Sequence, residues 1–313
     1  MLQLACPTCH GPFCIAQESI ACSSCGVAGK YVDGIPCFVD AARYEGEIPL
    51  EEMQRANRLA REAGWETALK EVLPRESAGI GDERRADFRH IWDLPQDAAV
   101  LDIGDSWGTI AAALGGAFAH VTVVENILER ARFIALRTRE LKLPVDVICA
   151  DYLHIPLAPG QFDAVALNKT LHARMPDAQG DSREMQLRLL KFAHQALKPS
   201  GFVCAGVENR FGWHRLLRGL RLRNGAGSAF MRSLAEYRAL LREAGYDSVR
   251  AFHSWHGCDA PAVLLPLDNR AALRHFLELH YCTRPRYWAL RAVARAGLWE
   301  RCAPEVIFVA EKG

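Results

Sequence analysis

The sequence of 313 residues lacks several features that would assign it to a membrane, exported or highly charged class of protein. It has no run of about 18 uncharged apolar residues, so no membrane-spanning helix is predicted. Its start, MLQLACPTCH, has neither a basic segment nor a long apolar one, so we expect no signal peptide and a cytoplasmic protein. The formal net charge of +1 argues against a strongly electrostatic partner over the whole surface.

The chain does contain enough apolar material for a large folded core. Half of the residues are hydrophobic and 24% are charged, which is typical of globular proteins. The length leaves room for one large domain and one small module. Without export, the 11 cysteines favour reduced thiols and a metal site over disulfide bonds.

The segment 99–126 has the pattern of strand, glycine turn, helix and strand. A short apolar run, 100–103, stops at Gly104, and small residues follow at a spacing compatible with a helix. A second, β-branched run then ends on the acid Glu125. In this order a βαβ unit holds an adenosine-bearing cofactor, because the turn brings backbone N–H groups to the ligand and the acid accepts the ribose hydroxyls.

The letters DIGDSWG, residues 102–108, resemble the first motif of class I S-adenosylmethionine (SAM)-dependent methyltransferases. They differ from a dinucleotide fingerprint, since no third glycine follows two residues after Gly108. They depart from the methyltransferase pattern at Ser106, where glycine is usual. The serine would either weaken cofactor binding or donate a hydrogen bond to the cofactor.

Acids and amides follow the later strands at matching places. The third strand, 145–149, precedes Asp151, whose carboxylate can accept the amino group of adenine. The fourth strand, 162–167, leads to Asn168. The resemblance implies a SAM-binding set drawn from all these motifs: Asp102, Gly104, Asp105, Ser106, Gly108, Glu125, Asn126, Asp151, Tyr152 and Asn168.

The resemblance also implies an α/β fold, a doubly wound, seven-stranded Rossmann-like sheet. The fifth strand, 202–207, leads to Glu208, and the closing strand, 304–310, is expected to run antiparallel beside the sixth. Before the sheet, 50–73 has the spacing of one amphipathic helix and 82–92 that of a second.

Four further segments, GQFDAVALNKTLH, SREMQLRLLKFAHQALKPSG, VENRFGW and EYRALLREAGY, are similar to bacterial methyltransferases associated with glycan pathways. This resemblance covers about 92–269. It implies a small-molecule acceptor, with a hydroxyl of a sugar, glycan-related or phosphorylated metabolite as the favoured target. The segment between Asn209 and Tyr237 is shorter than expected for that group, which puts the acceptor pocket in doubt.

The acceptor should lie beyond the carboxyl ends of the strands. His172 follows the fourth strand there, and Glu208 follows the fifth. We expect His172 to be the general base and Glu208 to orient it or to replace it. His253 and His256 are expected to follow the sixth strand and to lie near the reacting methyl group as well.

Two CxxC pairs stand at the start of the chain. Two such turns bring four thiolates onto one tetrahedral ion, the arrangement of a closed structural Zn²⁺ site. The surrounding letters, LACPTCHGPF, IACSSCG and KYVDGIPCFVD, resemble the zinc-ribbon activator subunit of tRNA, rRNA and release-factor methyltransferases. The expected ligands are Cys6, Cys9, Cys22 and Cys25.

A basic run separates the fifth strand from the next helix. Three interpretations of this run stay open: a solvated helix, a clamp for a phosphorylated acceptor, and a contact with RNA. An RNA methyltransferase is therefore one alternative function, and a non-catalytic scaffold, suggested by Ser106, is another. The run consists of Arg210, Arg215, Arg218, Arg221 and Arg223.

We expect three parts in the chain. They are a zinc ribbon over 1–44, a helical lead-in over 45–91 and a SAM-dependent methyltransferase domain over 92–313. A helical insertion over 266–302, before the last strand, would either cap the acceptor pocket or form the face of a homodimer.

Overall fold

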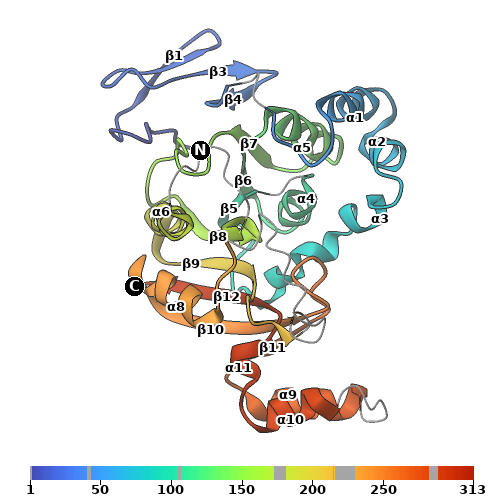
Figure 1. Ribbon diagram of the computed structural model, residues 1–313. Helices are drawn as coiled ribbons and strands as arrows, with labels where there is room; N and C mark the ends of the chain where they lie inside the picture. The colour runs from blue at the N-terminus through green and yellow to red at the C-terminus, as the bar shows by residue number, and fades with distance from the viewer. Residues whose placement is uncertain are drawn as a thin grey trace.

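A single mixed β-sheet runs through the computed structural model, which describes residues 2–40, 44–104, 107–172, 181–213, 215, 230–281 and 288–313. In the described residues the sheet has twelve strands in the order β1-β2-β3-β4-β7-β6-β5-β8-β9-β12-β10-β11 (Figure 1). The central strands are β5 (Ala99–Ile103), β6 (His120–Glu125), β7 (Val145–Cys149), β8 (Phe162–Asn168), β9 (Leu197–Glu208), β10 (Tyr246–Trp255) and β12 (Glu305–Lys312). The outer ones are β1 (Phe13–Ala16), β2 (Ser19–Cys22), β3 (Ala28–Val32), β4 (Ile35–Cys37) and β11 (Val263–Pro266).

The predicted seven strands form the middle of this sheet, but the predicted limit of seven is wrong. Strands β7, β6, β5, β8 and β9 are parallel, and β12 lies antiparallel between β9 and β10, as the sequence predicts. The sheet continues because β4 pairs in parallel with β7, where Cys37 faces Cys149. The backbone N–H of Phe38 donates to the carbonyl of Cys149 at 2.8 Å. The amino-terminal module therefore covers what would be a bare sheet edge.

Helices cover both faces of the sheet, so the apolar residues of its central strands are buried on each side. Leu101 and Ile103 point to the face covered by α6 (Ser182–Ala196) and α8 (Leu234–Glu243). Val100 points to the other face, under α4 (Thr109–Gly115) and α5 (Leu128–Glu140). This alternation makes the domain doubly wound, as expected.

The lead-in segment forms a separate apolar cluster beside the glycine turn. The predicted single helix over 50–73 is two helices, α1 (Leu50–Ala63) and α2 (Trp65–Val72), because Gly64 between them has a φ of +88°. A short helix α3 (Ser77–Ile80) and a 3₁₀ helix η1 (Glu83–Ile91) follow. Met53 and Trp65 pack with Trp107 and with Phe133 of α5.

Three helices lie between β11 and the last strand in the part of the chain that the structure describes. They are α9 (Arg270–Tyr281), α10 (Trp288–Arg295) and α11 (Trp299–Cys302), and α9 and α10 extend away from the body of the molecule (Figure 1). Among the described residues, no helix combines the length and apolar character that crossing a bilayer requires.

Candidate functional site

The turn after β5 needs glycine at two positions. Gly104 and Gly108 have φ values of +87° and +75°, which side-chain-bearing residues rarely adopt. A Cβ atom at Gly104 would also lie 3.0 Å from Oγ1 of Thr170. Gly108 stands immediately before α4, so the turn opens onto the helix N-terminus. Asp105 and Ser106, both predicted to bind SAM, lie outside the described residues.

Glu125, the predicted ribose-binding acid, is fully buried at the end of β6. Its Oε1 accepts hydrogen bonds from the backbone N–H groups of Asn126 at 2.9 Å and Ile127 at 3.2 Å. The hydroxyl of Tyr152 donates to the same oxygen at 3.4 Å. Desolvation raises the pKa of Tyr152 well above its ordinary value, so the phenol stays protonated and can donate. The structure thus brings Glu125, Asn126 and Tyr152 together.

Asp151 follows β7, at the same edge of the sheet as Gly104 and Glu125. Its Oδ1 accepts from the backbone N–H of Leu153 at 2.8 Å, and its Oδ2 lies 3.2 Å from Nδ1 of His154. The carboxylate is partly exposed. Asp102 is buried within β5, one residue before the strand's last position.

A cavity of about 320 Å³ lies between this edge and the amino-terminal module. Asn126, Ile127 and Asp151 form its wall on the sheet side. The module contributes Pro7, Thr8, Val27, Phe38 and Val39 to the opposite side. Residues predicted to bind adenosine and residues of the cysteine-containing module therefore line one cavity.

The lead-in segment is anchored to the glycine turn by Glu47 and Arg137. Nε1 of Trp107 donates to Oε1 of Glu47 at 2.8 Å, and Glu47 also forms an ion pair with Arg130. A guanidinium nitrogen of Arg137 donates to the carbonyl of Trp107 at 3.1 Å, and the guanidinium lies 3.9 Å from the ring centroid of Trp65. The Trp107 side chain is thus held against the lead-in helices.

Charged side chains gather at the carboxyl ends of β8 and β9. Lys169, with a φ of +64°, directly follows the predicted site residue Asn168. The Lys169 ammonium forms ion pairs with Asp259 and, at 3.8 Å, with Glu208. Glu208 also accepts from Arg215 at 2.9 Å. Arg215 and Arg210 are the members of the basic run that the structure describes, whereas Arg218, Arg221 and Arg223 lie outside the described residues.

His172 ends the 3₁₀ helix η2 (Thr170–His172), directly beside this cluster. Desolvation lowers its pKa to about 4, while the charge of Glu208 acts in the opposite direction. Both ring nitrogens are buried and have no hydrogen-bond partner among the described residues. His172 is therefore neutral near pH 7 and able to accept a proton.

Glu208 is half-buried, and burial alone would raise its pKa. The charge of Lys169 and the hydrogen bond from Arg215 outweigh burial, so the pKa of Glu208 lies below its ordinary value. The carboxylate therefore carries its charge near neutral pH. The structure places the two predicted catalytic residues in one electrostatically coupled cluster.

The two later histidines do not share this environment. His253 lies within β10, is buried, and packs edge-on against Trp255 and Trp299 with ring centroids 5.3 Å apart in both cases. His256 is exposed and has a φ of +75°. The expectation that His253 follows the sixth strand is wrong, because that strand extends to Trp255.

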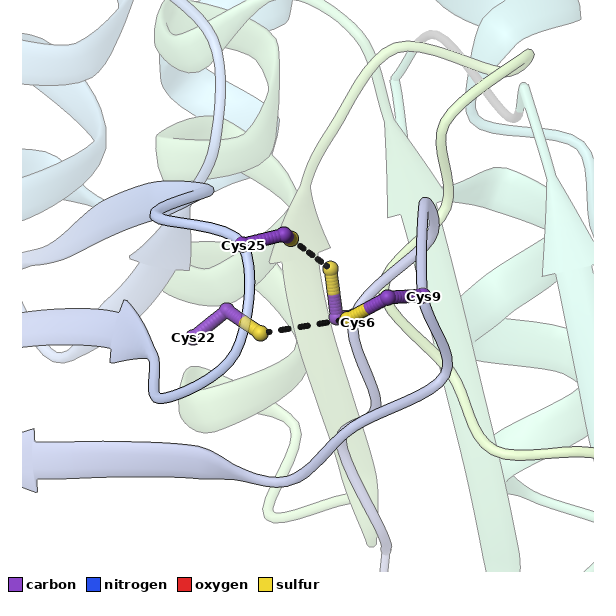
Figure 2. Close-up of side chains that lie close together, drawn as sticks. All are labelled: Cys6, Cys9, Cys22 and Cys25. Carbon is purple, nitrogen blue, oxygen red and sulfur yellow. Dashed lines mark hydrogen bonds between the residues drawn. The ribbon is translucent and has the colours of Figure 1, made fainter.

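The four predicted metal ligands converge at the amino-terminal module. Their sulfur atoms all lie within 4.8 Å of one another, with Cys6 and Cys25 at 3.3 Å and Cys9 and Cys22 at 3.4 Å (Figure 2). Four sulfurs around one Zn²⁺ ion stand about 3.8 Å apart. Backbone N–H groups, first that of Ser24, lower the pKa of Cys22 to about 6, which favours the thiolate. The cluster is compatible with a zinc ribbon.

Sequence patterns alone missed several residues of this site. Lys169, Asp259 and Glu305 come from three distant segments, and Lys169 lies 3.5 Å from Glu305. Arg137 and Glu47 also went unpredicted. Lys169 has a positive φ because of the turn that follows β8. A sequence does not reveal the backbone conformation of such a turn.

Comparison with known proteins adds a family match. Residues 100–201 match the family described as "Methyltransferase domain". No curated protein matches the chain.

The chain is also similar to solved structures. One is the phosphoethanolamine N-methyltransferase 2 of Haemonchus contortus in complex with S-adenosyl-L-methionine, with 15% identity and a TM-score of 0.50, covering 82% of this chain and 60% of that one. Another is a SAM-dependent methyltransferase of Thermotoga maritima, with 16% identity and a TM-score of 0.49, covering 83% and 99%. A third comes from the complex of the Haloferax volcanii Trm112 methyltransferase activator with a candidate methyltransferase, with 13% identity and a TM-score of 0.49, covering 82% and 96%.

Proposed function

We propose that this SAM-dependent methyltransferase transfers a methyl group to a hydroxyl of a small-molecule acceptor, a sugar, glycan-related or phosphorylated metabolite. SAM would lie at the carboxyl ends of β5, β6 and β7, and the acceptor at those of β8 and β9. We propose that the chain has three parts: a ribbon over 1–44, a lead-in over 45–91 and a catalytic domain over 92–313 with a helical insertion over 266–302.

The observation that carries the cofactor assignment is the cavity beside Asp151. Its wall combines Asp151 with Asn126 and Ile127, which directly follow the buried acid of β6. Adenine presents an amino group that a carboxylate can accept, and apolar walls suit its ring. The apolar residues Phe38 and Val39 on the module side fit the same requirement.

Calorimetry with S-adenosylhomocysteine tests this assignment. Asp151→Asn should weaken binding about tenfold or more, since a hydrogen bond to a charged group contributes roughly 1.5–3 kcal/mol. Asp146→Asn is the matched control, because Asp146 lies near the start of β7, the strand that Asp151 follows, and is exposed there. Equal affinity for the two variants would contradict the placement of adenine. A wild-type protein that binds no S-adenosylhomocysteine would remove the proposal.

Methyl transfer from a sulfonium is an in-line displacement, so the main task of the protein is to position the two reactants. A hydroxyl acceptor must also lose a proton. The neutral imidazole of His172 can take it, and the negative charge of the nearby Glu208 carboxylate can stabilise the imidazolium that forms.

Steady-state kinetics with His172→Ala tests the base. We expect kcat to fall about 100-fold while the affinity for S-adenosylhomocysteine stays unchanged. His256→Ala, a change at an exposed histidine, should leave both quantities unaltered. Full turnover by the His172 variant would disprove its assignment as base.

We propose further that Cys6, Cys9, Cys22 and Cys25 hold a structural Zn²⁺ ion. Four thiolates leave no open position on the ion, so the metal would serve folding of the module. A module of this size buries too little apolar surface to fold without such support. Native mass spectrometry should show one zinc per chain, lost in Cys22→Ser and kept in Cys14→Ser, which alters an exposed cysteine outside the cluster. Zinc retained by the Cys22 variant would contradict this ligand set.

A further inference from the structure

The helices between β11 and β12 form an arm, defined here as residues 270–281 and 288–302. Figure 1 shows α9 and α10 of this arm projecting beyond the sheet. The inner side of the arm is anchored by buried apolar residues, among them Leu273, Leu277 and Trp299. The arm is therefore a fixed part of the fold and presents its outer side to the surroundings.

The outer end of the arm carries two strongly exposed apolar side chains. Leu279, near the end of α9, is 65% exposed, and Trp288, at the start of α10, is 67% exposed. They are the most exposed large hydrophobic residues of the described chain. Because the two positions belong to the adjoining ends of paired helices, both lie at the outer end of the arm. Strongly exposed apolar side chains on a protruding element indicate an interaction surface.

The arm is also basic. Its described residues include five arginines and two glutamates, a net charge of +3 in a chain whose total is +1. The two glutamates form ion pairs with arginines of the arm, Glu300 with Arg270 at 3.7 Å and Glu278 with Arg295 at 3.9 Å, so the other three arginines carry its net charge. Arg274 is exposed, and no ion pair is found for it among the described residues. The arm is therefore complementary to an anionic partner.

We propose that the arm docks on an anionic phospholipid surface, with Trp288 and Leu279 inserted at the interface and the arginines facing the headgroups. Exposed tryptophan and leucine on helices rich in arginine are features of interfacial helices. A second copy of the chain is a poorer occupant, because two arms of charge +3 repel each other. Nucleic acid is poorer too, since the aliphatic Leu279 offers no ring face to stack on a base.

The arm is connected to the acceptor side of the proposed active site. Nδ2 of Asn209, the residue after Glu208, donates to the carbonyls of Arg301 at 2.9 Å and Ala303 at 2.8 Å. Trp299 at the base of the arm packs against His253 and Trp255 of β10. Docking would thus hold the carboxyl ends of β8 and β9, where the acceptor is proposed to bind, close to the bilayer surface. This consequence rests on the proposed function, whereas the docking proposal itself does not.

Vesicle co-sedimentation of the full chain tests the proposal. Wild-type protein should bind phosphatidylcholine vesicles that contain phosphatidylglycerol and bind pure phosphatidylcholine vesicles at least about tenfold more weakly, since each arginine near an anionic surface contributes about 1 kcal/mol. Binding should decline as salt is added.

Variants separate the contribution of the arm from that of the rest of the surface. The double change Leu279→Ala and Trp288→Ala should weaken vesicle binding about tenfold or more. Ile15→Ala, which alters a 54% exposed residue on β1, is the matched control and should bind like wild type. Arg274→Gln should weaken binding only to the anionic vesicles.

Three results would overturn the proposal. The first is equal binding to neutral and anionic vesicles, and the second is unchanged binding by the double variant. The third is no vesicle binding together with a dimer that the double variant converts to a monomer in light scattering, which would assign the arm to a second copy. Methyltransferase activity enters none of these measurements, so failure of the proposed function and failure of docking can be distinguished.

Discussion

Substitution of Arg137 by methionine should destabilise the protein and loosen the glycine turn. Arg137 is fully buried in α5, although the three other arginines of that helix are more exposed. Its guanidinium donates to the Trp107 carbonyl and to Oγ1 of Thr109, each at 3.1 Å. It also stacks on Trp65. One side chain therefore connects the turn, the first residue of α4 and the lead-in helices.

The magnitude follows from these contacts. Each hydrogen bond from a charged donor contributes roughly 1.5–3 kcal/mol, and the cation–π contact about 1–2 kcal/mol. Methionine keeps the apolar volume, and removing the charge relieves a desolvation cost of several kcal/mol. The expected loss in the free energy of unfolding is about 2–4 kcal/mol. Because the Trp107 carbonyl loses its donor, we also expect S-adenosylhomocysteine affinity to fall about tenfold.

Urea unfolding and calorimetry measure the two effects. Arg139→Met is the matched control, since Arg139 is exposed on the same helix and its loss should alter stability by less than about 0.5 kcal/mol. If Arg137→Met and Arg139→Met were equally stable, the buried contacts of Arg137 would contribute nothing, and the bracing of the turn would be disproved.

Three further perturbations have directions that the structure sets. Burial lowers the pKa of His253 to about 4, so the folded state binds fewer protons than the unfolded state below pH 6.5, and stability falls as pH decreases. When the pH is lowered from 7 to 5, the free energy of unfolding of His253→Phe, measured in urea, should therefore fall by about 2 kcal/mol less than that of wild type. Equal decreases in the two proteins would contradict this prediction. Lys169→Met should raise the pKa of Glu208, moving the acidic limb of the pH–rate profile to higher pH, and an unmoved limb would exclude coupling. Gly104→Ala should weaken S-adenosylhomocysteine binding, because its Cβ would contact Thr170. Gly160→Ala is the control: Gly160 also has a positive φ but no atoms near its Cβ position, so the change should lower stability by about 1–3 kcal/mol and leave the affinity unchanged.

Local patterns predicted the central unit well. The strand, helix and strand over 99–126 are confirmed as β5, α4 and β6, because periodicity and glycine placement act over a few residues. The third strand over 145–149 and the antiparallel closing strand are confirmed too. The convergence of the four cysteines is likewise confirmed, since their spacing alone sets it.

Predictions failed where distant segments decide the structure. The parallel pairing of β4 with β7 depends on one backbone register between residues more than a hundred positions apart, and no local pattern encodes it. The helical spacing over 50–73 does not reveal the break at Gly64, because the break depends on the positive φ of that residue. The spacing of the arginines on α5 did not indicate that Arg137 would be the fully buried one. Its burial depends on α1 and α2, which come from a distant part of the sequence and pack against α5.

The site was predicted in part for the same reason. The acid that ends β6 and the acid that follows β7 could be predicted because the sequence marks where strands end. Lys169, Asp259 and Glu305 meet only after β8, the loop beyond β10 and β12 have assembled. The catalytic roles of His172 and Glu208 stay predictions, and so do the individual SAM contacts.

The junction between β4 and β7, one pair of facing residues with one further backbone hydrogen bond beside it, has a consequence for any attempt to divide the chain. Shortened protein that begins after the amino-terminal module would present the unpaired backbone of β7, whose inner residues Val147, Ile148 and Cys149 are buried in the intact chain. An open, apolar strand of this kind recruits other strands. We expect such a fragment to self-associate. The amino-terminal module would therefore keep the rest of the chain from aggregating, in addition to any other role.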